Sequence, residues 1–333
     1  MNMKAFALAS AALVGLAGTA PAETLSIGDW QSTTHIVSVE GTTWWMKKVE
    51  ELTDGAVTFE HFPAEQAAKA NALLDAVRNG ILDAALIGPS YHSELMPMNS
   101  VIGLPGLYGS AVDGTETLQA MFEEGPLRDE FTAEGVVPIF AFTLPPYQVL
   151  AKERLGGPAD WAGMDLRTSG STQALTARSL GAVGISLPGP EIYTAVERGR
   201  LDGILFPLAS VPAYKLNEVV SHISTNGSFG GYSFVVVVGQ DVWDGLSEDV
   251  QAAMIEAGKE AAMNVAKAQD DSIGALVDEW KAAGVDTYAL SDEELAEVNA
   301  ALEEVSADWL ERIGGGSDAA KAVLDGFKSM EMN

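Results

Sequence analysis

Along this chain the spacing of hydrophobic positions changes repeatedly between the alternation typical of strands and the three- to four-residue repeat of amphipathic helices. Short apolar runs bounded by Gly, Pro or Asp predict strands at residues 24–28, 56–62, 81–88, 136–144, 147–153, 163–168 and 232–240. Amphipathic stretches predict helices at residues 38–55, 64–80 and 171–181, the last with Ser171 as its N-cap. Alternating strands and helices indicate βαβ units and parallel sheets, so we expect an α/β protein.

One helix–strand pattern occurs twice. Residues 76–89 (AVRNGILDAALIGP) and 195–208 (AVERGRLDGILFPL) align without gaps at an offset of 195 − 76 = 119 residues. Each reads as the end of a helix, a Gly that stops it, a Leu-Asp pair and an apolar strand; coincidence is the alternative, since this order is common. We interpret the pair as two similar lobes. Open α/β sheets bind ligands at the carboxyl ends of their strands, and these two ends carry Tyr91 and Phe206.

The C-terminal part of the chain has a helical pattern. Residues 247–283 contain few helix breakers and predict one helix of about 55 Å, which either bends near Gly274 or braces both lobes. Ser291 and Glu294 have the spacing of a capping box at the start of a further helix. We expect two lobes with a ligand cleft between them. The first lobe is expected to contain residues 23–144 and 229–270, and the second residues 145–228 and 271–333.

The first 22 residues have the features of a secretory signal peptide. Lys4 is followed by an apolar stretch at residues 5–17 and by Ala20-Pro21-Ala22, which is similar to a cleavage site. The apolar stretch is too short to span a bilayer, and no later run reaches that length. We therefore expect an exported, periplasmic protein that loses residues 1–22 and inserts no segment in the membrane.

Charge and cysteine content narrow the range of partners. The 333 residues include 19 Lys and Arg against 47 Asp and Glu, and loss of Lys4 with the signal peptide gives 18 − 47 = −29. This acidity disfavours nucleic acid and anionic membrane surfaces as partners, although an acidic surface is often only a solubility device. Because the sequence has no Cys, it can form neither disulfides nor thiolate metal sites.

Sequence motifs of catalysis and cofactor binding are absent. No G-x-G-x-x-G follows a strand, and there is no P-loop, H-E-x-x-H or G-x-S-x-G. The four histidines, His35, His61, His92 and His222, lie far apart, and each fits a surface or satisfied histidine better than a catalyst. We expect no metal, no cofactor and no enzymatic activity.

Aromatic residues stand at the ends of several expected strands and at turns. They are Trp30, Trp44, Trp45, Tyr91, Tyr147, Phe206, Phe229 and Tyr232. Each alone is more often a core residue, but several of them around one cation would form an apolar site with a fixed charge. Arg167 is the candidate cation, because it lies in an apolar, strand-like segment of an acidic chain. A structural ion pair with Asp160 or Asp165 is the alternative role.

Several segments together resemble the periplasmic solute-binding receptors of tripartite ATP-independent periplasmic (TRAP) transporters, of the dicarboxylate-receptor type. The segments that carry the resemblance are FPAEQ, DAVRNGILDAALIGPSY, LPGLY, DWAGMDLRTSG, SLPGPEIYTAVERGRLDG and VWDGLSEDVQAAM. The resemblance covers nearly the whole chain after residue 22. It implies a two-lobed binding protein that captures a small organic acid and delivers it to the membrane subunits of a TRAP permease. It also implies that Arg167 clamps the ligand carboxylate with its planar guanidinium.

Two departures from that family suggest the kind of acid. Many members carry a second Arg in the preceding strand, where this chain has Tyr147 and Gln148, and many carry Asn near the position of Phe206. A dicarboxylate or sugar acid would need those polar groups, because an unpaired buried charge is costly. We therefore expect a monomeric receptor for a monocarboxylate with an aromatic or apolar body. Its ligand-binding residues are expected to be Arg167, Trp30, Tyr91, Tyr147, Gln148, Phe206 and Phe229.

Other functions remain open at this point. One is a receptor for a dicarboxylate or a sugar acid, with Lys69 as a second cation that reaches in from the helix after FPAEQ. Another is a secreted α/β hydrolase or lyase that anchors its substrate on Arg167. The third is a ligand sensor that signals its closure to a membrane partner other than a permease.

Overall fold

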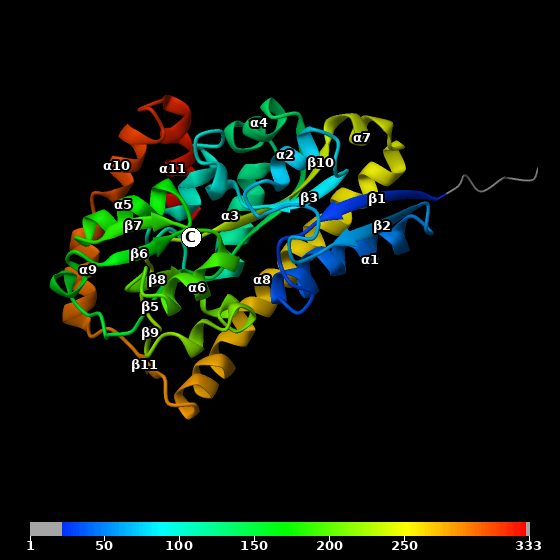
Figure 1. Cartoon of the computed structure of the whole chain (residues 1–333). Helices are drawn as coiled ribbons and strands as arrows, with labels where there is room; N and C mark the ends of the chain where they lie inside the picture. Colours follow the sequence, from blue (N-terminus) through cyan, green and yellow to red (C-terminus); the bar gives the residue numbers. More distant parts are fainter. Residues whose placement is uncertain (1–21, 331–333) are drawn as a thin grey trace, which may run out of the picture.

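The computed structural model describes residues 22–330, so residues 1–21 of the expected signal peptide lie outside the described residues. The described chain forms two lobes, each built on one β-sheet with helices packed on it (Figure 1). The first sheet has the strand order β2-β1-β3-β10-β4. Its strands are β1 (Glu23–Gly28), β2 (Val57–Phe62), β3 (Ala84–Ile87), β4 (Val136–Thr143) and β10 (Ser233–Gly239).

The second sheet has the strand order β11-β9-β5-β8-β6-β7. Its strands are β5 (Gln148–Ala151), β6 (Asp165–Thr168), β7 (Val183–Ser186), β8 (Gly203–Phe206), β9 (His222–Ser224) and β11 (Asp286–Tyr288). The helices are α1 (Thr43–Leu52), α2 (Leu73–Arg78), α3 (Ala111–Phe122), α4 (Pro126–Ala133), α5 (Ser171–Ser179), α6 (Ile192–Glu197), α7 (Gln240–Gly245), α8 (Glu248–Ala282), α9 (Asp292–Leu302), α10 (Val305–Arg312) and α11 (Asp318–Met330).

Both sheets are mixed, so the expectation of parallel sheets holds for some of the strand pairs and is wrong for others. β10 runs antiparallel to β3 and β4, and β5 runs antiparallel to β8 and β9. The other paired strands are parallel. The chain reaches β5 and β10 directly from the opposite lobe. Neither strand follows a βαβ crossover within its own sheet, which is the connection that makes neighbouring strands parallel.

Two connecting segments run side by side between the lobes. The chain leaves the first sheet through residues 144–147 and returns to it through residues 229–232. Backbone hydrogen bonds join the segments; the Tyr147 N–H, for example, donates to Gly230 O at 2.8 Å. The two segments, residues 144–147 and 229–232, therefore form a short hydrogen-bonded connection between the lobes.

α8 is a third connection between the lobes. It is one continuous helix of 35 residues, about 52 Å long, and it crosses from α1, α3 and β4 to β11 (Figure 1). The Asp270 carboxylate accepts the backbone N–H groups of Ala111 and Val112, at 2.9 Å each, and thereby ties α8 to the start of α3. Trp280, which is 1% exposed, packs into the core of the second lobe. The helix is thus a brace, with no break at Gly274.

The C-terminal helices divide between the lobes. Ser291 and Glu294 form the capping box that their spacing predicts, at the start of α9. α9 and α10 pack against α5 of the second lobe, whereas α11 packs against α3 and α4 of the first. The assignment of residues 271–333 to the second lobe therefore does not describe α11, whose buried Leu324 and Phe327 join the core beside α3. The remaining lobe boundaries stay a prediction.

The helix expected at residues 64–80 is much shorter than the pattern suggests. α2 begins at Leu73, because Ala64 and Glu65 have positive φ angles of 52° and 60°, which a right-handed helix does not allow. The Glu65 carboxylate accepts the Ala70 backbone N–H at 2.9 Å and stabilises the turn. The Ala64 N–H donates to Gln31 O at 2.8 Å, so this loop supports the chain after β1.

The other expected helices lie close to their predicted bounds. The segment at 38–55 begins as a π-helical turn, Ser38–Thr42, and continues as α1. In α5 the N-cap position belongs to Gly170 and not to Ser171.

The repeated sequence pattern corresponds to a repeated structure. α2 and β3 are separated by Gly80, and α6 and β8 by Gly199, with φ angles of +66° and +70° at the two glycines. Such angles favour Gly, which explains why both copies keep it. The repeat therefore places Tyr91 and Phe206 at the ends of equivalent strands, one in each lobe.

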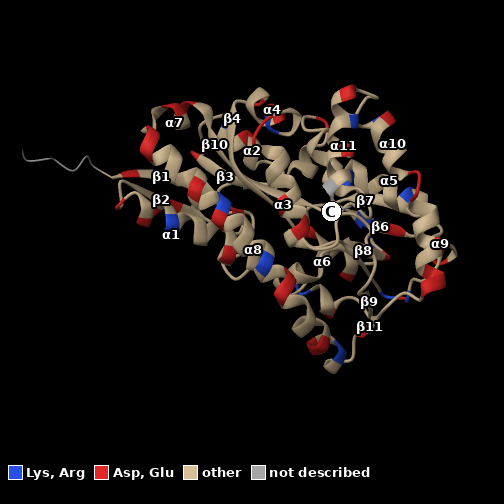
Figure 2. Ribbon diagram, turned by 180° about the vertical axis from the view of Figure 1, so that it is seen from behind, with Lys and Arg blue, Asp and Glu red and all other residues tan. Residues whose placement is uncertain are grey.

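Acidic residues are spread over the helices of both lobes, with Lys and Arg interspersed (Figure 2). In this view, Lys and Arg do not gather in one region of the ribbon. Within residues 22–330, no helix combines the length and the apolar character needed to cross a bilayer.

Candidate ligand-binding site

Arg167 lies in β6, between β8 and the edge strand β7 of the second sheet, and its side chain is held by backbone groups. It is 1% exposed. Its Nε–H donates to Leu187 O at 2.8 Å, and Nη1 donates to Leu205 O at 3.1 Å. Nη2 lies 3.4 Å from the hydroxyl oxygen of Tyr91, across the cleft. Three of the five N–H groups of the guanidinium are engaged, which leaves one on each terminal nitrogen.

The structure does not support an ion-pair role for Arg167. Among residues 22–330, none of the ion pairs involves its guanidinium. Asp160 accepts the Gly156 backbone N–H at 2.8 Å instead. A buried cation without an acidic partner is unfavourable by several kcal/mol, and the neutral carbonyls of Leu187 and Leu205 compensate it only in part. The arrangement therefore favours an anion beside Arg167.

Tyr91 follows β3 in the first lobe and supplies a second group beside this cation. Its hydroxyl oxygen accepts the Gly189 backbone N–H at 3.2 Å in addition to Arg167 Nη2 at 3.4 Å. Because both bonds use the oxygen as acceptor, the hydroxyl proton is available to a further acceptor. Tyr91 and Arg167 can thus both donate to one carboxylate.

Aromatic rings form the walls of a narrow, nearly filled cavity around Arg167. The guanidinium lies 5.4 Å from the Phe206 ring centroid, a cation–π contact, and the Tyr147 ring lies 6.2 Å from Phe206. The cavity is lined by Trp30, Gln31, His35, Tyr91, Leu144, Tyr147, Arg167, Gly189, Phe206, Ser210, Tyr214, Tyr232 and Phe234. Arg167 is the one residue with a formal charge among these lining residues, so the cavity is apolar with a single fixed cation.

The buried phenols around the cavity remain protonated at neutral pH. Burial raises the pKa of Tyr147, and the nearby Arg167 offsets this only in part. Burial likewise raises the pKa of Tyr214 and Tyr232 well above the ordinary value. These hydroxyls are therefore neutral hydrogen-bonding groups, and they add no negative charge to oppose an anionic ligand.

His35 is a further neutral group in the cavity wall. Its Nδ1 accepts the Val37 backbone N–H at 3.0 Å, so the ring proton belongs on Nε2. Nε2 is buried and has no hydrogen-bond partner among the described residues. Burial lowers the pKa of His35 to about 3, so the ring is uncharged at neutral pH.

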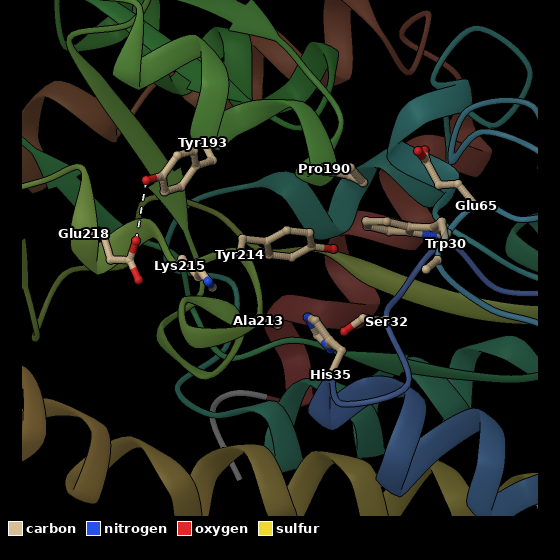
Figure 3. Close-up of a pocket in the computed structure, with 11 residues that line it drawn as sticks. Trp30, Ser32, His35, Glu65, Pro190, Tyr193, Ala213, Tyr214, Lys215 and Glu218 are labelled. Atoms are coloured by element: carbon tan, nitrogen blue, oxygen red, sulfur yellow. Dashed lines mark hydrogen bonds between the residues drawn. The ribbon is translucent and has the colours of Figure 1, made fainter.

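A larger pocket, with about 1000 Å³ of empty space, opens on the outer side of the cavity (Figure 3). Trp30, His35 and Tyr214 line both spaces and separate them. The Tyr214 hydroxyl donates to the side-chain carbonyl of Gln31, a hydrogen bond between the two lobes. The cavity is therefore closed on this side by contacts that cross the cleft.

The structure brings together five of the seven residues expected to bind the ligand. Trp30, Tyr91, Tyr147, Arg167 and Phe206 all line the cavity.

Gln148 and Phe229 lie elsewhere, and we leave both out of the proposed site. The Gln148 side chain bonds the backbone of Gly227, with Nε2 donating to the carbonyl at 2.6 Å and Oε1 accepting the N–H at 2.9 Å. Neighbouring residues of an extended segment point to opposite faces, so Tyr147 faces the cavity and Gln148 faces away. Phe229 is fully buried against Trp161, with ring centroids 4.9 Å apart.

Eight lining residues are absent from the expected set, and four of these are polar residues of the segments after β1 and β8: Gln31, His35, Ser210 and Tyr214. A signal for one of them was present in the sequence. The repeat offset places Ser210 in the position equivalent to Tyr91, since 91 + 119 = 210. The other three residues have no such signal, because their role depends on the closure of one lobe against the other.

The sequence model of the bacterial extracellular solute-binding protein family 7 (DctP) matches residues 30–312. The chain belongs to this family. The family consists of solute-binding proteins, so membership supports a receptor and gives no support to a hydrolase or lyase.

Curated relatives of this DctP-family chain cover most of its length. It is 27% identical over 282 residues to the 2,3-diketo-L-gulonate-binding periplasmic protein YiaO of Escherichia coli, covering 83% of this chain and 84% of YiaO. It is 29% identical over 283 residues to the C4-dicarboxylate-binding periplasmic protein DctP of Rhodobacter capsulatus, covering 81% and 82%.

Solved structures of TRAP solute-binding proteins share the fold. One, from a marine metagenome and specific for aromatic acid ligands, holds 3-hydroxybenzoate; it has a TM-score of 0.86 at 21% identity and covers 93% of this chain and 98% of its own. Another, from Rhodoferax ferrireducens, holds copurified benzoate; it has a TM-score of 0.86 at 22% identity, with coverage of 93% and 97%. The DctP-family chain thus has the two-lobed fold of these TRAP solute-binding proteins.

Proposed function

We propose that this receptor binds a small organic monocarboxylate with an aromatic or otherwise apolar body. The observation that carries the proposal is the buried guanidinium of Arg167, which has no acidic partner and faces a cavity walled by aromatic rings. The ligand carboxylate would accept the two remaining N–H groups of Arg167 and the hydroxyl proton of Tyr91. The apolar body would lie against Trp30, Tyr147 and Phe206.

The energetics favour a carboxylate in this position. Two unit charges 4 Å apart attract by about 4 kcal/mol at an effective dielectric constant of 20, against about 1 kcal/mol in bulk water. Closure of the lobes excludes water from the pair and so strengthens it. A bidentate guanidinium–carboxylate pair also fixes the orientation of the acid.

A monocarboxylate fits the charge of the cavity better than a dicarboxylate. Lys69, the other cation considered, has a side chain that is 74% exposed and paired with Glu65 at 2.6 Å, so it lies outside the cavity. A second carboxylate would therefore be buried without a counter-charge. The ligands of several structural neighbours (benzoate, 3-hydroxybenzoate and mandelate) support the same class, although the names of YiaO and R. capsulatus DctP point to other acids.

The proposal also includes where and how the receptor acts: it works in the periplasm as a monomer and delivers the acid to a TRAP permease. It is supported by the family match and by the signal-peptide pattern of residues 1–22. Growth on the identified acid, with and without the gene for this receptor, would test delivery. Sedimentation analysis would test the monomeric state.

Ligand binding is the decisive experiment. A thermal-shift screen of benzoate, phenylacetate, mandelate, short keto and hydroxy acids, C4 dicarboxylates and sugar acids, followed by calorimetry, would rank their affinities. An acid present at 100 times its Kd raises the free energy of unfolding by about 2.7 kcal/mol. We expect an aromatic or apolar monocarboxylate to bind most tightly. A dicarboxylate or sugar acid that binds more tightly than every monocarboxylate would overturn the proposal.

A further inference from the structure

Four buried polar atoms in the cavity wall have no hydrogen-bond partner among residues 22–330: Trp30 Nε1, His35 Nε2, Ser210 Oγ and the Tyr232 hydroxyl oxygen. Two of them, His35 Nε2 and Ser210 Oγ, come from opposite lobes. His35 Nε2 belongs to the loop after β1, and Ser210 Oγ belongs to the segment after β8. Both residues line the cavity, and they are 1% and 2% exposed. An unsatisfied buried polar group costs about 1–3 kcal/mol, so two of them facing one closed space indicate a missing hydrogen-bonding partner.

The hydrogen-bonding roles of the two atoms define that partner. Because His35 Nδ1 accepts the Val37 N–H at 3.0 Å, Nε2 carries the proton and can only donate. Ser210 Oγ can donate or accept. Figure 3 shows one ring nitrogen of His35 on the side of the ring that faces Tyr214. The partner must therefore offer an acceptor to His35, and a hydroxyl or carbonyl oxygen satisfies both groups.

His35 lies apart from the carboxylate-binding end of the cavity. His35 also lines the outer pocket, together with Trp30 and Tyr214, whereas Arg167 lines the inner cavity and not the outer pocket. Tyr91 and Phe206, whose side chains contact Arg167, are likewise absent from the outer pocket. A ligand held by Arg167 at one end thus meets His35 toward the other.

The acceptor at this end is neutral. None of the residues that line the cavity besides Arg167 carries a formal charge, since the burial that lowers the pKa of His35 to about 3 keeps its ring uncharged. The buried Asp29 carboxylate stands next to this loop and accepts the Gln31 N–H at 2.8 Å, so a second carboxylate would meet negative charge. A neutral hydroxyl or carbonyl oxygen needs no counter-charge and is not repelled by Asp29.

We infer that His35 and Ser210 form a second subsite, which binds a neutral hydroxyl or carbonyl oxygen on the part of the ligand away from its carboxylate. The inference rests on the proposed function and narrows it: the acid has an apolar body and carries one further neutral oxygen. His35 donates to that oxygen from the first lobe and Ser210 bonds it from the second, so the subsite is complete only when the lobes are closed.

Calorimetry with matched acids tests the subsite. The pairs are phenylacetate with 3- and 4-hydroxyphenylacetate, and benzoate with 3- and 4-hydroxybenzoate; terephthalate serves as the diacid. We expect at least one hydroxylated acid to bind about tenfold more tightly than its parent, and terephthalate to bind more weakly than benzoate.

Two variants test whether the gain in affinity from the hydroxyl group arises at this subsite. His35→Asn keeps an acceptor for the Val37 N–H but lacks the Nε2 donor, and Ser210→Ala removes the other group. We expect each variant to reduce the hydroxyl gain, which is the affinity of a hydroxylated acid divided by that of its parent acid, to less than threefold. Equal losses for hydroxylated and parent acids in both variants would overturn the inference. So would parent acids that bind wild type as tightly as every hydroxylated acid, and this result would leave the proposed function intact. If no monocarboxylate of the wider thermal-shift screen binds wild type, the proposed function itself fails.

Discussion

The hydroxyl of Tyr214 in the second lobe donates a hydrogen bond to the side-chain carbonyl of Gln31 in the first lobe. Both residues line the inner cavity, and Tyr214 also lines the outer pocket. The bond thus closes the cavity on the side where it meets the outer pocket. A bound acid that leaves by this route must first break the contact.

We expect Tyr214→Phe to accelerate ligand release. Loss of one hydrogen bond of about 0.5–1.5 kcal/mol in the closed state raises the dissociation rate constant roughly two- to tenfold, with little change in the association rate constant. Stopped-flow fluorescence would measure both constants. Tyr193→Phe is the matched control, because the Tyr193 hydroxyl bonds Glu218 within the second lobe. An unchanged dissociation rate in Tyr214→Phe, or an equal acceleration in the control, would contradict the closing role.

We expect Arg167→Ala to abolish binding of the acid and to leave the unliganded fold intact. Substitution removes a buried cation that has no acidic partner, so the loss of hydrogen bonds to Leu187 O and Leu205 O is offset by relief of an unpaired charge. Arg167→Lys should also bind at least about a hundredfold more weakly, since an ammonium cannot reproduce the fork of donors. Calorimetry and thermal unfolding would report the two effects. Arg178→Ala, which removes an exposed ion pair with Asp308, should bind normally.

The sequence could predict a site residue where the identity of that residue in its local segment was unusual or repeated. Arg167 could be singled out because a cation in an apolar strand needs a reason, and the repeat placed Tyr91 and Phe206 at equivalent strand ends. Tyr147 and Gln148 show the limit of such reasoning. Both are buried, but neighbouring positions face opposite ways, and only the fold shows that Tyr147 faces the cavity.

His35 shows a second limit. As one of four scattered histidines it carried no local signal, and its surroundings include Tyr214 of the second lobe, with ring centroids 5.6 Å apart, which is distant in the sequence. The expected helix at residues 64–80 failed for a related reason. The left-handed backbone of Ala64 and Glu65 is stabilised by two hydrogen bonds, from the Ala64 N–H to Gln31 O and from the Ala70 N–H to the Glu65 carboxylate. Helix propensity takes no account of such contacts.

We expect His35 to make the protein less stable in acid. The pKa of His35 is about 6.5 in the unfolded chain and about 3 in the folded protein, because burial disfavours the charged ring. Below pH 6.5 the unfolded state therefore binds a proton that the folded state does not. The free energy of unfolding falls by up to about 1.4 kcal/mol for each pH unit between 6.5 and 3.

Comparison with His35→Asn isolates this effect from the titration of the many carboxylates. Urea unfolding at pH values from 7.5 to 4.5 should give a wild-type curve that falls more steeply below pH 6.5 than that of the variant. Above pH 6.5 the two curves should run parallel. Parallel curves over the whole range would show that His35 is not buried in its neutral form.

Closure of the lobes also depends on Gly170, the residue that precedes α5. A Cβ atom there would lie 2.4 Å from the backbone carbonyl oxygen of Ser90 in the first lobe and 3.1 Å from Ser93 Oγ. The Gly170 backbone is extended, with a φ of 168°, so Ala is tolerated by the second lobe itself. We therefore expect Gly170→Ala to hold the lobes apart, to weaken binding at least tenfold and to leave the thermal stability of the unliganded protein nearly unchanged.

Small-angle scattering with saturating acid should show incomplete compaction of this variant. Gly245→Ala is the control, because nothing lies within 4 Å of its added Cβ. Wild-type affinity in Gly170→Ala would show that the lobes bind the acid without the close approach of Gly170 to Ser90.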